Sequence, residues 1–115
     1  MTTYYQFFSV GSFRVVNLGC WKDTGDRAIQ SLEGKHDLLQ GYYAFRSHPY
    51  DKCLEVARSL GYDVFALQDG GQCFSASNAD LTYTKFGESS FCESDGEGGP
   101  WANEVYKIVQ ICEFK

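Results

Sequence analysis

The sequence predicts an α+β fold in which a single helix packs on a twisted antiparallel β-sheet and disulfides staple the two together. Three observations predict it. Residues 49–60 carry apolar side chains at helical spacing, residues 62–73 indicate two strands joined by a hairpin turn, and five cysteines occur in 115 residues. A chain of this length forms one domain, so we treat residues 1–115 as a single unit with a sheet of about four to six strands.

The two ends of the chain predict the terminal strands of the sheet. Residues 3–18 are apolar and aromatic. The glycine at position 11 interrupts them, which indicates two strand segments or one strand bent by a β-bulge near Gly11. Residues 105–114 predict a closing strand. Because both terminal strands are hydrophobic, we expect them to pair side by side. Residues 23–26, Asp-Thr-Gly-Asp, predict a turn after the first strand.

The helix is predicted between Pro49 and Gly61. Proline suits the first turn of a helix, and glycine is a common residue just after the last turn. Between them, one apolar face is formed at the spacing i, i+3, i+4 and i+7 by Cys53, Val56, Ala57 and Leu60. The preceding residues 30–48 are polar and predict a long loop.

A hairpin follows the helix. Residues 62–68 alternate in part between apolar and polar side chains, and Asp69-Gly-Gly is a strong signal for a hairpin turn. The second strand of the hairpin carries Cys73. Residues 75–100 are rich in serine, glycine and acidic side chains and predict a further loop region before the closing strand.

Composition and charge exclude several classes of function. A net charge of −5 is unfavourable for binding nucleic acid, which needs a basic patch. The sequence contains no run of 18 apolar residues, so we expect no membrane span. Five cysteines favour an oxidising compartment, which predicts a secreted, extracellular protein. Their odd number leaves at least one thiol unpaired or intermolecular.

Catalytic, metal and cofactor sites are not expected. His36 and His48 lie in loop-like sequence without a nucleophile motif around them, so we expect no enzyme. No C-x-x-C pair is present, so we expect no zinc site. Asp95 and Glu97 lie in a glycine-rich turn whose oxygens could bind calcium, and the sequence leaves this question open.

Aromatic side chains next to polar ones are the most informative candidates for a binding site. Sugars stack on tryptophan rings while polar side chains bond their hydroxyl groups. Trp21 and Trp101 are the candidate stacking groups, with core packing as the alternative for each. The candidate polar contacts are Asp23, Arg27, Gln68 and Asn103.

Four stretches carry a pattern that extends over residues 17–106. They are Leu18-Gly-Cys-Trp-Lys-Asp-Thr-Gly-Asp-Arg-Ala-Ile29, the Cys53 helix followed by Gly61-Tyr62, Gly71-Gln-Cys-Phe74, and Gly98-Gly-Pro-Trp-Ala-Asn-Glu-Val-Tyr106. Together they resemble a divergent WSC domain, an extracellular module related in shape to the PAN/apple fold. The resemblance implies a PAN/apple-like fold and a non-catalytic, carbohydrate-binding, lectin-like function.

The chain departs from the family at two cysteine positions. Ala57 and Ser75 stand where the family has a second cysteine on the helix and on the strand. Loss of both together is what one expects if those two positions pair in the family. By the same logic, the resemblance implies that Cys53 pairs with Cys73.

The resemblance leaves the partner of Cys20 open. WSC domains imply a bridge from Cys20 to Cys92, with Cys112 as the odd thiol. Apple domains, whose terminal strands are bridged, imply Cys20 with Cys112 and leave Cys92 unpaired. Each bridge would contribute roughly 3–4 kcal/mol to the free energy of unfolding.

Three interpretations of function follow. The first is a secreted glycan-binding module. The second is a protein-interaction or assembly module, in which the chain is a monomer or a dimer linked through Cys112 and its partner is an extracellular protein. The third is a small secreted effector or ligand carrier, suggested by the aromatic-rich ends at residues 3–16 and 105–114.

Overall fold

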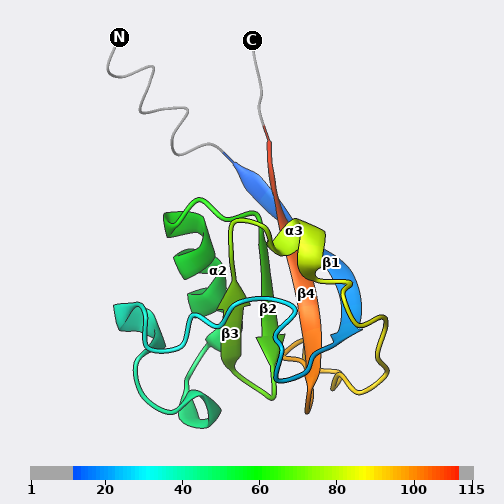
Figure 1. Cartoon of the computed structure of the whole chain (residues 1–115). Coiled ribbons are helices and arrows are strands. Elements are labelled where there is room, and N and C mark those ends of the chain that lie inside the picture. Colours follow the sequence, from blue (N-terminus) through cyan, green and yellow to red (C-terminus); the bar gives the residue numbers. More distant parts are fainter. Residues whose placement is uncertain (1–11, 112–115) are drawn as a thin grey trace, which may run out of the picture.

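A computed structural model describes residues 12–111 and confirms the α+β architecture (Figure 1). Four strands form one antiparallel sheet in the order β1-β4-β2-β3. The strands are β1 Phe13–Lys22, β2 Val64–Gln68, β3 Gln72–Ser75 and β4 Ala102–Gln110. Helix α2, Pro49–Ser59, lies against the sheet. The loops hold three further single turns, η1 Asp37–Leu39, η2 Tyr43–Phe45 and α3 Ala79–Thr82.

The terminal strands pair side by side, as predicted. β1 and β4 run antiparallel from Phe13 opposite Gln110 to Lys22 opposite Ala102. The expected bulge near Gly11 lies outside the described residues, but β1 does contain an irregularity between Asn17 and Gly19. At this point Gly19 adopts a φ of 103° and its backbone N–H donates to the Asn17 side chain. β4 begins three residues before the predicted start, at Ala102.

Helix α2 begins at the predicted Pro49 and ends in a Schellman motif. Gly61 has a φ of 76°, its N–H donates to Arg58, and the N–H of Tyr62 donates to Ala57. The prediction that Leu60 points inward is wrong, because Leu60 is 47 % exposed. The helix has already ended at Ser59, and the motif folds Tyr62 back towards the core in its place.

The predicted hairpin joins β2 to β3. Its turn needs two residues with positive φ, and Asp69 and Gly70 supply them with φ values of 54° and 94°. All five residues of β2 are buried because each face of the strand is covered. Phe65 and Leu67 pack in the core beneath α2, whereas Val64 and Ala66 pack in a second core with α3 and residues 28–29.

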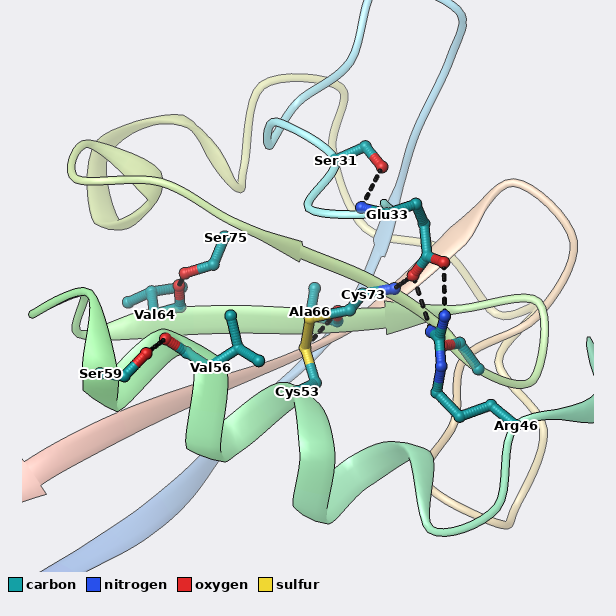
Figure 2. Close-up of a disulfide and its surroundings, with 11 residues drawn as sticks. Ser31, Glu33, Arg46, Cys53, Val56, Ser59, Val64, Ala66, Cys73 and Ser75 are labelled. Carbon is teal, nitrogen blue, oxygen red and sulfur yellow. Dashed lines mark hydrogen bonds and ion pairs between the residues drawn. A yellow bond between two sulfur atoms is a disulfide. The ribbon is translucent and has the colours of Figure 1, made fainter. Parts of the chain in front are cut away.

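Two disulfides staple this arrangement, and both are pairs that the WSC resemblance implies. Cys53 on α2 bonds Cys73 on β3, with Cα atoms 5.5 Å apart (Figure 2). Cys20 on β1 bonds Cys92 in the loop before β4. The alternative bridge from Cys20 to Cys112 is therefore wrong, and Cys112 lies outside the described residues.

An ion pair that the sequence does not signal holds the long loop 30–48 against β3. Arg46 donates to both carboxylate oxygens of Glu33, at 2.8 Å each, and also to the carbonyl of Gly71. The same carboxylate accepts the backbone N–H of Cys73 (Figure 2). Such a bidentate pair fixes geometry as well as charge. The predicted loop is thus irregular but firmly attached.

Candidate functional site

Four of the predicted site residues meet at one end of the sheet. Gln68 donates from Nε2 to Asp23 Oδ2 and to Asn103 Oδ1, both at 2.8 Å. Arg27 Nη1 donates to the same Asp23 oxygen at 2.9 Å, and the backbone N–H of Ala28 donates to the other oxygen. The Asp23 carboxylate is the centre of the cluster. It accepts hydrogen bonds from the loop, at Arg27 and Ala28, and from the sheet, at Gln68.

The strand register explains this meeting. Gln68 is the last residue of β2 and lies opposite Asn103 of β4, so their side chains share one face of the sheet. Asp23 follows β1 directly, and the turn that it begins crosses this face. Residues Asp23, Gln68 and Asn103 are 4 %, 3 % and 0 % exposed. Asp23 and Gln68 therefore find their partners within the cluster instead of in solvent, whereas Asn103 Nδ2 is buried without a hydrogen-bond partner among the described residues.

Trp101 lies over this network. Trp101 is 54 % exposed, and its backbone carbonyl accepts the N–H of Asp23 at 3.0 Å. The Arg27 guanidinium carbon lies 5.0 Å from the Trp101 ring and 5.1 Å from the buried Phe74 ring. Arg27 thus lies within cation–π distance of two aromatic rings and is also bonded to Asp23.

The backbone at Trp101 is in an unusual conformation. Its φ of 53° lies in the left-handed region, which a bulky residue rarely adopts. The glycines before it hold the loop close to the sheet. A Cβ atom on Gly98 would collide with the Leu67 carbonyl, and one on Gly99 would collide with the Phe91 carbonyl. The loop therefore turns tightly and presents the indole outward.

Trp21, near the end of β1, has a different environment from Trp101. Its Nε1 donates to the Leu18 carbonyl at 2.9 Å, and its ring meets Tyr83 edge-on at 5.3 Å. The ring packs against the second core, with Val64 and Ala66 among its members. This placement agrees with the core-packing alternative weighed for Trp21.

A polar groove of about 400 Å³ begins beside Arg27. It is lined by Asp26, Arg27, Gln30, Ser31, Glu33 and Lys35. Both of its carboxylates already have partners outside the lining, since Asp26 pairs with Lys85 and Glu33 pairs with Arg46. Of this lining, the sequence singled out Arg27 as a site residue but not the groove itself, because Gln30, Ser31, Glu33 and Lys35 occur in a loop segment without a motif.

A second aromatic group projects from η2. Tyr42 and Phe45 are 61 % and 86 % exposed, and the ring of Tyr42 contacts those of Tyr43 and Phe45. Tyr43 donates its hydroxyl proton to Asp69 at 2.9 Å. This hydrogen bond is the main reason that the pKa of Tyr43 rises to about 12, with smaller contributions from burial and from the Asp69 charge.

The structure contains no group of three His, Cys, Asp or Glu side chains within residues 12–111 that could hold a metal ion. In the acidic turn, Asp95 Oδ1 accepts the backbone N–H of Glu97, so the Asp95 side chain bonds the backbone of the turn itself. Burial, followed by the nearby Asp95 charge, raises the pKa of Glu97. Over the same described range, no helix has the length and apolar character needed to cross a membrane.

Comparison with known proteins adds no relative. No family model matches the chain, and no curated protein or solved structure matches it significantly.

Proposed function

We propose that this chain is a secreted, non-catalytic carbohydrate-binding module of WSC-like, PAN/apple-like type. Its ligand site consists of the exposed Trp101 ring, the Arg27 guanidinium and the adjoining polar groove. The observation that carries this proposal is the exposed indole, fixed in a left-handed backbone conformation over a buried polar network. The two disulfides support it, because they are the pairs that the resemblance implies.

A strained, exposed aromatic residue is informative about function. A non-glycine residue with positive φ costs about 1–3 kcal/mol, and such residues cluster at binding sites. Because Trp101 is 54 % exposed, burial of the indole offsets that cost only in part. A rigid, open aromatic surface next to hydrogen-bonding groups is the arrangement on which a sugar ring stacks.

The buried polar residues have a supporting role in this proposal. Asp23, Gln68 and Asn103 bond one another and are almost fully buried. They orient Arg27 and the loop that carries Trp101, while Arg27 is the polar side chain that remains in reach of a ligand, with its side chain 33 % exposed.

A glycan array tests the proposal. The wild-type protein is expected to bind at least one glycan class that a Trp101→Ala variant does not bind. Phe45→Ala is the matched control, because it removes an aromatic ring of even greater exposure on η2. The proposal is wrong if no glycan class binds the wild-type protein above the Trp101→Ala variant.

An assembly function is the second candidate. Four of the five cysteines pair within the chain, so Cys112 is the remaining thiol. A disulfide dimer through Cys112 would give twice the chain mass without reductant and the single mass with it. A single mass under both conditions would remove this candidate. The carrier interpretation gains no support, since Val56, Ala57, Phe65 and Leu67 fill the space between α2 and the sheet.

A further inference from the structure

We propose that the groove beside Arg27 selects glycans that carry an acidic group, either the carboxylate of a uronic acid or a sulfate ester. This inference rests on the proposed glycan-binding function and specifies its ligand class. It starts from the charges of the groove lining and of its ion-pair partners, whose sum differs in sign from the net charge of the protein as a whole.

The charges around the groove leave an excess of positive charge. The lining supplies two cations, Arg27 and Lys35, and two carboxylates. The two carboxylates are paired with Lys85 and Arg46, and Arg27 is paired with Asp23. With these partners included, four cationic side chains stand against three carboxylates, a net charge of +1. The chain as a whole carries −5.

Lys35 is the cation that accounts for this excess. It forms no ion pair with any residue in the range 12–111, although it lines the same groove as Arg27. An acidic group bound in the groove would supply the missing counter-charge.

Arg27 provides the directional part of the site. A guanidinium group has five N–H donors, and the described residues accept one side-chain hydrogen bond from Arg27, at Asp23. Asp23 bonds one end of the group, and the Phe74 and Trp101 ring centroids lie 5.1 and 5.0 Å from its central carbon, so its position is fixed. A planar guanidinium that is already oriented matches a carboxylate or sulfate through paired hydrogen bonds at a low entropic cost. A sugar stacked on Trp101 would place its acidic substituent within reach of these donors.

Matched pairs of probes separate charge from sugar shape. One pair is an oligogalacturonate and its methyl ester, which differ in charge but have the same sugar ring. The other pair is a sulfated and an unsulfated galactan oligosaccharide. We expect the acidic member of at least one pair to bind about tenfold more tightly than its neutral partner. We also expect this preference to shrink as salt is added.

A conservative variant locates the preference. Lys35→Gln is expected to reduce the acidic-to-neutral affinity ratio about fivefold. Lys107→Gln is the control, since it removes the same charge from an exposed position on β4 outside the groove. Neither residue belongs to the buried network, so both variants should fold.

The outcomes distinguish the two proposals. If no probe and no array glycan binds, the glycan-binding function itself is wrong. If in both pairs the neutral probe binds as tightly as its acidic partner, glycan binding stands and the acidic preference is wrong. If the preference exists but Lys35→Gln and Lys107→Gln change it equally, the groove is not its source. The pair that shows the larger preference tells carboxylate from sulfate.

Discussion

The two faces of the sheet are covered in different ways. On one face, helix α2 buries Cys53, Val56 and Ala57 against Phe65 and Leu67, and a disulfide fixes the contact. On the other face, loops and one short helix provide the cover, and the end of that layer is polar.

The difference shows what each kind of cover requires. A helix satisfies its own backbone groups, so it can cover a sheet with apolar side chains alone. A loop brings unpaired backbone and polar groups with it, and these need partners when they are buried. Asp23 meets that need by accepting from Ala28 and Gln68. The same polar network then provides a rigid base for Arg27 and Trp101, so the loop-covered face carries the candidate site.

The largest expected effect comes from the disulfides, which fasten both regions. Replacing Cys20 and Cys92 with alanine should lower the free energy of unfolding by about 4 kcal/mol, and replacing Cys53 and Cys73 should lower it by about 3 kcal/mol. The order follows from loops of 72 and 20 residues, because the longer loop gains more entropy when it is released. Urea unfolding of the two double variants measures both values. The reverse order would show that the helix-covered face depends on its bridge for more than chain entropy.

The next effect tests the polar network of the loop-covered face. Asp23→Ala should lower the free energy of unfolding by about 3 kcal/mol, because it leaves Gln68 and Ala28 N–H groups without an acceptor and Arg27 without its counter-charge. Asp26→Ala is the matched control. Its carboxylate is 82 % exposed and pairs with an exposed lysine, so its loss should cost less than 1 kcal/mol. Equal effects in urea unfolding would contradict the comparison between the faces.

How far these two regions could be predicted from sequence follows from the same physics. The apolar face of α2 repeats with the helical period, so its inward residues, Cys53 among them, were predictable. The prediction for Leu60 was wrong because the helix ends before it, in a C-terminal motif that depends on the following glycine. For the site, residue type pointed to Asp23, Arg27, Gln68 and Asn103, and these do meet. Their burial was not predictable, because it depends on a loop from a distant part of the chain.

A smaller effect separates stability from binding at Trp101. Replacing this residue with glycine should relieve the strain of the positive φ. We expect the free energy of unfolding to rise by about 1 kcal/mol at most. Glycan binding should be lost at the same time. Thermal unfolding and the array, run on one preparation, check both. A marked loss of stability would mean that the exposed indole serves packing and not a ligand.

The smallest effect is the titration of Tyr43, which bonds Asp69 in the hairpin turn. Tyr43 must be protonated to donate to Asp69, and its folded pKa of about 12 lies above the usual value of 10.0. Its contribution to stability is therefore complete below about pH 10 and is lost as the pH rises to about 12. Absorbance titration of tyrosinate should show one fewer late-ionising group in Tyr43→Phe. In Asp69→Asn, that group should ionise earlier, and an Asp69→Asn curve identical to that of the wild-type protein would disprove the assignment.

The adjacent ends of the described chain have a mechanical consequence. The N–H of Ile111 donates to the carbonyl of Ser12, so a force that separates the ends would unzip β1 from β4 one residue pair at a time. At Cys20 the load would pass through sulfur to Cys92. Segment 21–91, with α2 and the second bridge, would then carry no tension. In single-molecule stretching, the oxidised chain should therefore release far less length than the reduced one.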